Sequence, residues 1–117
     1  MWFLAIGAAA ICEEYAYRGV LFLLVEQSLP PTLAGLASAL LFGLAHFGQG
    51  WRGAILSTLF GLGLQLIVAL SGGLFLAILA HLLYNFGVVW LGRRLTRANR
   101  GNAVRKLHAA DEISNRK

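Results

Sequence analysis

Charged side chains are almost absent from the first 92 residues of this chain. Only five lie between residues 1 and 92, whereas residues 93–117 hold eight of the ten basic side chains. The whole chain is 58% hydrophobic and only 13% charged. In soluble proteins roughly a quarter of all residues are charged, because the protein surface must be hydrated. The distribution therefore predicts a membrane protein that ends in a basic tail.

Four apolar segments follow one another along the chain, at residues 2–25, 32–47, 53–70 and 73–91. A membrane-crossing helix needs about 17 to 25 residues, so the second segment is short. The breaks contain Pro30 and Pro31, a glycine-rich loop around Trp51, and Gly72 and Gly73. Because lipid cannot satisfy free backbone groups, each segment should be helical. We expect an all-α, polytopic membrane helical bundle with about four transmembrane helices.

The basic residues also predict the orientation of this bundle in the cell membrane. Lys and Arg concentrate in cytoplasmic loops, and here they lie in the loop with Arg52 and in the tail. Four crossings then place both termini in the cytoplasm. Residues 1–92 would form the transmembrane core, and residues 93–117 a basic cytoplasmic tail. A basic run directly after an apolar span is more typical of contact with anionic lipid than with nucleic acid.

Three charges in the first span need an explanation, because each ionised side chain at mid-membrane costs roughly 2.5 to 3.5 kcal/mol. Glu14 and Arg18 are four residues apart, so they share a helix face and can form a structural ion pair. Glu13 is rotated by about 100° from Glu14 and has no basic partner in its own helix. It is therefore the acid left over for chemistry.

Polar side chains in two other spans supply candidate partners for Glu13. His46 lies near the end of the second span, and His81 and Asn85 lie four residues apart on the fourth. His81 and Asn85 therefore project from one helix face. A lone histidine in a helix is more often structural, but two histidines with an acid and an amide in so apolar a chain indicate a functional site. By their depth, all could line one cavity open to the cytoplasm.

At this point the residues resemble a known family. "EEYAYR" fits an EExxxR motif, "FGLAH" an FxxxH motif and "HLLYN" an HxxxN motif, within about residues 11–87. In this order they resemble the CAAX protease and bacteriocin-processing (CPBP or Abi) family of intramembrane endopeptidases, which includes the type II CAAX prenyl proteases. The resemblance implies that the chain hydrolyses a peptide bond in a membrane-associated protein or peptide, without a cofactor.

The resemblance also implies roles for the site residues. Glu13 would be the general base on a water held with His46, and His81 and Asn85 would stabilise the oxyanion. Glu14 and Arg18 would hold the helix that carries the base. Family members usually have further transmembrane helices before EExxxR, and here only twelve residues precede that motif. A transmembrane partner or a homo-oligomer is therefore an alternative to a complete single-chain enzyme.

Three other functions remain open from the sequence. Glu13, His46 and His81 would be the ligands of a zinc-dependent metalloprotease, although no HExxH motif is present. A non-catalytic membrane immunity or accessory protein would keep the fold and bind a peptide or a membrane protein. A proton or ion pathway would use the same polar residues. The single cysteine, Cys12, excludes an internal disulfide.

Overall fold

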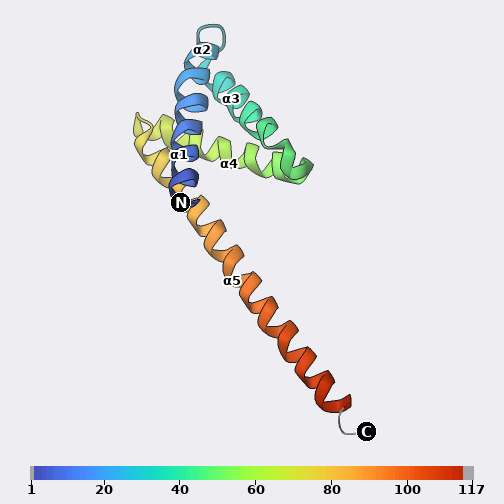
Figure 1. The fold of residues 1–117 in the computed structure, drawn as a ribbon. Coiled ribbons are helices and arrows are strands. Elements are labelled where there is room, and N and C mark those ends of the chain that lie inside the picture. Colours follow the sequence, from blue (N-terminus) through green and yellow to red (C-terminus); the bar gives the residue numbers. More distant parts are fainter. Residues whose placement is uncertain (1, 115–117) are drawn as a thin grey trace. The chain divides into compact units, whose positions relative to one another are not determined.

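The computed structural model describes residues 2–114, with side chains described for residues 3–102 and 105. Helices account for nearly all of them (Figure 1): α1 (Trp2–Glu14), η1 (Tyr15–Leu21), α2 (Phe22–Glu26), α3 (Pro31–Ala45), η2 (Phe47–Gln49), α4 (Gly50–Ser71) and α5 (Phe75–Ser114). Because α1, η1 and α2 follow without a break, they form one segment. Four long helical segments result, with no strand among residues 2–114, which confirms the all-α prediction.

The breaks between the four segments come from proline and glycine, as expected. Pro31 is the first residue of α3, a position that suits proline because its missing N–H would be unpaired there. Gly72 ends α4 with a φ of 71°, the left-handed conformation that glycine adopts without a steric penalty. The short η2 turn leads into Gly50, which also has a positive φ of 84°.

The first helical segment differs from an ordinary α-helix, because η1 is a π-helix. At its end the backbone N–H of Phe22 donates to the carbonyl of Tyr17, five residues earlier. The π-helix begins directly after Glu14 and contains Arg18. Such turns are rare in proteins and occur frequently at functional sites. Sequence analysis treated this segment as a regular α-helix and missed the change.

The chain divides into two units, Met1–Tyr84 and Asn85–Lys117, and the boundary in the sequence falls within the residues of α5. In the first unit α3 and α4 form an antiparallel hairpin with extensive contact between the two helices (Figure 1). Gly43 of α3 makes this closeness possible, because a Cβ there would collide with the Thr58 hydroxyl and the Ala54 carbonyl of α4. Small residues at helix interfaces are typical of membrane proteins.

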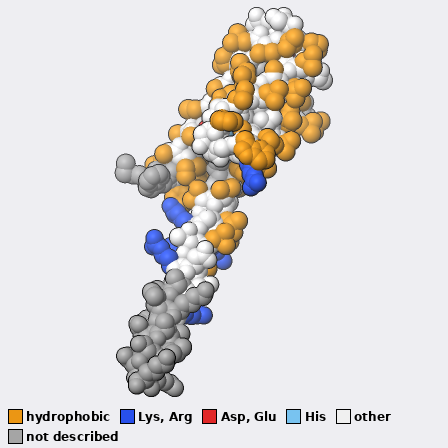
Figure 2. All heavy atoms as spheres, turned by 90° about the vertical axis from the view of Figure 1, so that its right-hand side faces the viewer, with side chains coloured by type: hydrophobic (Ala, Val, Ile, Leu, Met, Phe, Trp, Pro, Cys, Tyr) orange, Lys and Arg blue, Asp and Glu red, His pale blue; other side chains and the backbone are white. Residues whose placement is uncertain are grey.

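The first unit is apolar outside and partly polar inside, the reverse of a soluble domain. Its buried side chains include Glu14, Arg18, Ser38 and His81, whereas many leucines are exposed. Hydrophobic side chains cover the face of this unit seen in Figure 2. The helices over Phe47–Ser71 and Phe75–Asn102 are long and apolar enough to cross a bilayer, and α3 is a shorter apolar helix. The chain is a membrane protein.

The second unit is the continuation of α5 beyond Tyr84. It carries the basic residues that follow the apolar span, several of which are visible in Figure 2. The guanidinium of Arg94 lies 4.2 Å from the centre of the Trp90 ring, a cation–π contact. The basic segment is thus helical as far as Ser114, and residues 115–117 of the predicted tail lie outside the described residues. The boundary at residue 92 stays a prediction.

Candidate active site

The centre of the polar cluster is the carboxylate of Glu14, which is completely buried. Its Oε1 atom accepts a hydrogen bond from Nη1 of Arg18 at 3.1 Å, one helical turn away. The same oxygen lies 2.7 Å from Nδ1 of His81 on α5, a residue 67 positions later in the chain. One carboxylate oxygen therefore joins the first helical segment to the last helix of the unit.

Arg18 extends this connection to α3 and α4. Its Nη2 donates to the backbone carbonyl of Gly61 on α4 at 3.1 Å, and its guanidinium lies 4.4 Å from the centre of the Phe42 ring on α3. Gly61 provides the necessary space, because a Cβ there would lie 3.0 Å from Nη2 and 3.1 Å from Phe42. The arginine thus contacts three other helical elements through one planar side chain.

The pairing inside the cluster is incomplete. Oε2 of Glu14 and Nε of Arg18 are buried without a hydrogen-bond partner among the described residues. Buried polar groups nearly always have partners, and an unpaired one costs roughly 1 to 3 kcal/mol. These two unpaired atoms therefore lower the stability of the fold. Such a loss is expected at a functional site, where side chains are arranged for chemistry as well as for stability.

Glu13 lies on the other side of His81. Its Oε2 atom is 3.6 Å from Nε2 of His81, beyond the range of a direct hydrogen bond. The Glu13 side chain is 33% exposed, whereas that of His81 is only 4% exposed. Each imidazole nitrogen of His81 thus faces a different glutamate. Sequence analysis identified Glu13 as unpaired in its own helix, but it did not anticipate that both acids would approach one histidine.

The contact with Glu14 defines the chemistry of His81. An ionised carboxylate can only accept a hydrogen bond, so the geometry assigns a proton to Nδ1. In the neutral ring, Nε2 then presents its lone pair toward Glu13, and in the imidazolium form both nitrogens donate. The ring also packs edge-on against Phe60, with centroids 5.3 Å apart. These contacts fix both the tautomer and the orientation of the imidazole.

His46 takes a different position. It follows α3 directly, and its Nδ1 donates to the carbonyl of Phe42 at 2.8 Å, which leaves Nε2 without a hydrogen bond to a described residue. The Phe42 ring has its centre 4.5 Å from the His46 ring and 6.0 Å from the His81 ring. The two histidines are thus linked through an aromatic ring. No hydrogen bond or ion pair connects His46 to Glu13 within the described part of the chain.

The zinc alternative requires Glu13, His46 and His81 as a common ligand set. Among the described residues, no group of three His, Cys, Asp or Glu side chains lies close enough to hold a metal ion. The ligand set proposed for zinc is therefore not assembled in this geometry.

Asn85 follows His81 by one turn of α5 and belongs to the second unit. Of the residues identified from the sequence, the first unit by itself brings together Glu13, Glu14, Arg18 and His81. His46 lies one aromatic ring away from them. The role of Gly61 was missed, because nothing in the local sequence indicates which carbonyl will accept from Arg18.

In a comparison with known proteins, one protein-family model matches most of the chain. A family model described as "Type II CAAX prenyl endopeptidase Rce1-like" matches residues 1–87. This region contains the EExxxR, FxxxH and HxxxN motifs and the whole of the first unit. Neither the curated proteins nor the solved structures that were compared gave a match.

Proposed function

Because the chain belongs to the type II CAAX prenyl endopeptidase Rce1-like family, we propose that it is an intramembrane endopeptidase with a glutamate-activated water. The family is one of CAAX-type membrane proteases, so peptide-bond hydrolysis is the expected class of reaction. The observation that supports the finer proposal best is the position of Glu13. It is the more exposed of two adjacent glutamates, and it faces a buried histidine whose other nitrogen is already engaged.

Glu13 acts as the general base in this proposal. The 3.6 Å separation between its Oε2 and Nε2 of His81 is too long for a direct hydrogen bond, so the part-exposed carboxylate remains available to a water in this proposal. Removal of a proton from that water by a positioned carboxylate gives typically 10² to 10⁴-fold acceleration. The resemblance to the family implies that His46 contacts this water through its unbonded Nε2; this requires the ring to move toward Glu13, because Phe42 separates it from the cluster in this geometry.

His81 and Asn85 form the oxyanion site. They lie one turn apart on α5, so both can donate toward one substrate oxygen. With Nδ1 held by Glu14, the imidazolium form of His81 donates from Nε2, and the Asn85 amide supplies a second donor. Such donors strengthen as negative charge develops in the transition state, and each contributes about 10² to 10³-fold.

Glu14 and Arg18 are positioning residues rather than catalytic ones. Glu14 holds the His81 ring in one tautomer, and Arg18 holds Glu14 while it anchors the first helical segment to α4. A carboxylate that orients a histidine in this way is a common feature of acid–base sites.

The substrate is a membrane-associated protein or peptide, and the enzyme is a multi-pass protein of the cell membrane with both termini in the cytoplasm. Residues 1–92 are the proteolytic core in this proposal, and residues 93–117 are a basic tail that contacts anionic lipid. Cysteine labelling at Ser28→Cys and Ser114→Cys checks the orientation in intact cells. Labelling of position 114 from outside would contradict it.

A cleavage assay tests the function. The purified protein in lipid vesicles is incubated with a panel of tagged membrane peptides, and wild type is compared with Glu13→Gln and with Glu26→Gln. Glu26, at the end of α2, is a matched control because it takes no part in the cluster. We expect cleavage by wild type and Glu26→Gln but not by Glu13→Gln. Equal cleavage by all three proteins would exclude the proposed base, and chelator-sensitive cleavage with bound zinc would favour the metalloprotease alternative.

A further inference from the structure

An apolar groove lies between α3 and α4 of the first unit, at the end of the hairpin where η2 joins the two helices. Its volume is about 340 Å³, within the range of ligand-binding sites. Its lining is apolar apart from one threonine and includes Leu40, Leu44, Phe47, Trp51, Ile55 and Thr58. The Thr58 hydroxyl donates to the carbonyl of Ala54 within α4, so the groove does not require a hydrogen bond from its occupant.

The groove runs along the helices away from η2. Trp51 and Thr58 are seven positions apart on α4, which corresponds to about 10 Å along the helix. The helix over Phe47–Ser71 is long and apolar enough to cross a bilayer, so η2 lies at the end of a membrane span. Phe47 and Trp51 are more than half exposed there, and tryptophan at a span end is typical of the headgroup level. One end of the groove therefore lies at the level of the lipid headgroups, and the other extends into the hydrocarbon layer.

A positive charge lies beside the headgroup end of the groove. The guanidinium of Arg52 is 5.3 Å from the centre of the Trp51 ring, which lines the groove. Arg52 is exposed, and it is the only Asp, Glu, Lys or Arg between residues 27 and 92. None of the ion pairs among the described residues involves it. Its guanidinium is therefore available to an anion, and its planar set of donors matches the geometry of a phosphate.

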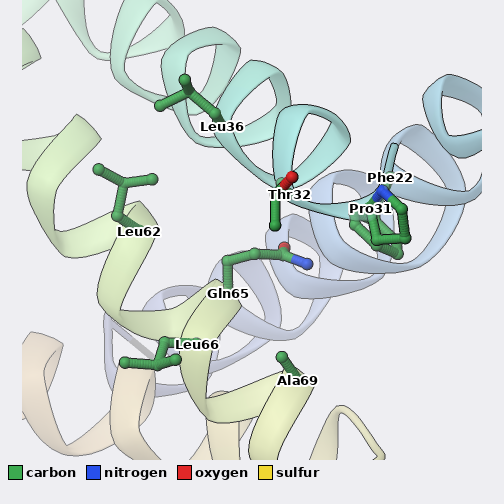
Figure 3. A pocket seen from close by; sticks show the side chains of 9 residues that line it. Phe22, Pro31, Thr32, Leu36, Leu62, Gln65, Leu66 and Ala69 are labelled. Carbon is green, nitrogen blue, oxygen red and sulfur yellow. The ribbon is translucent and has the colours of Figure 1, made fainter. Parts of the chain in front are cut away.

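A second apolar pocket provides a comparison on the same two helices. It lies between α2, α3 and α4, and its volume is about 450 Å³ (Figure 3). Thr32 and Gln65 are polar, but no charged side chain is among the described residues that line it. Leu66 of α4 lines this pocket and is 58% exposed, close to the 61% of Trp51 in the groove. The second pocket thus offers apolar contact without a cation.

We propose that the groove binds an anionic phospholipid of the bilayer, with an acyl chain between α3 and α4 and the phosphate at Arg52. An apolar groove that ends beside a single cation suits an amphiphile with an apolar chain and an anionic head. A zwitterionic lipid fills the groove equally well but carries no net negative charge. One basic side chain at the membrane surface should favour the anionic lipid about 5-fold. The site is independent of the proposed hydrolytic function, because no residue of the polar cluster lines it.

The test uses the full chain in detergent micelles and measures the quenching of tryptophan fluorescence by lipids with brominated acyl chains. Trp2→Phe and Trp90→Phe leave Trp51 as the sole reporter, at the groove itself. The probes are phosphatidylglycerol, which is anionic, and phosphatidylcholine with the same brominated chains, which is zwitterionic. We expect half-maximal quenching of Trp51 at an about 5-fold lower concentration of phosphatidylglycerol.

Two controls separate the groove from the rest of the chain. Arg52→Gln should abolish the preference for phosphatidylglycerol, whereas Arg94→Gln, which removes the same charge from α5, should preserve it. A second reporter protein combines Trp51→Phe with Leu66→Trp, which moves the tryptophan to the pocket without a cation. Both lipids should quench this tryptophan at the same concentration.

Equal quenching of Trp51 by the two lipids would overturn the proposal and indicate non-selective contact with the bilayer. A preference that persists in Arg52→Gln would also overturn it. So would a preference that disappears in Arg94→Gln or is equally strong at position 66, because either result assigns it to the net charge of the chain. Quenching of Trp51 by neither lipid would show that the groove admits no acyl chain. None of these measurements requires cleavage, so they are separate from a failure of the hydrolytic proposal.

Discussion

Two side chains in the first unit, Glu14 and Gln65, have buried oxygen atoms that differ in their hydrogen bonding. Oε1 of Glu14 has two partners inside the chain, Arg18 and His81, which come from two different helices. Oε1 of Gln65 has none among the described residues. In a membrane protein both groups are costly to bury. The comparison indicates that the first oxygen connects helices within this chain, whereas the second is enclosed by the helices without a hydrogen bond to a described residue.

The largest effect on stability should come from breaking the internal pairing. Arg18→Met leaves Glu14 buried without its cationic partner, so the free energy of unfolding should fall by about 3 to 5 kcal/mol. Equilibrium unfolding in mixed micelles measures it. Adding Glu14→Gln to Arg18→Met should recover part of that loss, because the uncompensated charge is then removed. A double variant that is less stable than Arg18→Met would show that Glu14 stabilises the fold without the arginine.

A smaller loss of stability is expected when the space around Arg18 is reduced. Gly61→Ala places a methyl group 3.0 Å from Nη2 of Arg18, and overpacking of this kind costs typically 1 to 3 kcal/mol. Gly63 is a matched control on the same helix, because a Cβ there meets nothing within 4 Å. Gly63→Ala should be neutral or stabilising by up to about 1 kcal/mol. Equal effects of the two alanines in the unfolding assay would contradict the role assigned to Gly61.

The smallest effect is expected at the unpaired amide. Gln65→Leu should change the free energy of unfolding by less than about 1 kcal/mol or increase it, because it removes a buried oxygen that lacks a partner. The same unfolding assay in micelles measures this change. A loss as large as that of Arg18→Met would mean that Gln65 is satisfied within the chain, and the contrast with Glu14 would disappear.

The sequence predicted the helical segments because each depends on local properties. Apolar runs, Pro31 and Gly72 determine where helices begin and end whatever surrounds them. The spacing of Glu14 and Arg18 likewise predicted that they could meet on one face. The contact between Glu14 and His81 joins residues 67 positions apart, so no local pattern could reveal it. The π-helix was missed because the spacing of apolar residues predicts a helix but does not distinguish a π-turn from an α-turn.

The contacts of His46 likewise could not be predicted from the sequence. Its motif placed it at the end of the second span, where the structure has it, but the hydrogen bond to Phe42 depends on the local ending of α3. The buried Gln65 gave no signal in the sequence, since a glutamine near a span end is commonly exposed to headgroups or water. Only the packing of α4 against Gly35 shows that its amide oxygen is enclosed.

The central claim is that the two adjacent glutamates have different roles: Glu13 is the general base, and Glu14 stabilises the fold and positions His81. Glu13→Gln and Glu14→Gln differ by one position and make the same chemical change, so they control for each other. Cleavage and unfolding should be measured for both in the same lipid and with the same peptide. We expect Glu13→Gln to lose at least about 10²-fold in turnover with nearly unchanged stability, and Glu14→Gln to lose stability because Arg18 is left unpaired. An active, stable Glu13→Gln beside an inactive, equally stable Glu14→Gln would contradict the claim and assign the base to Glu14.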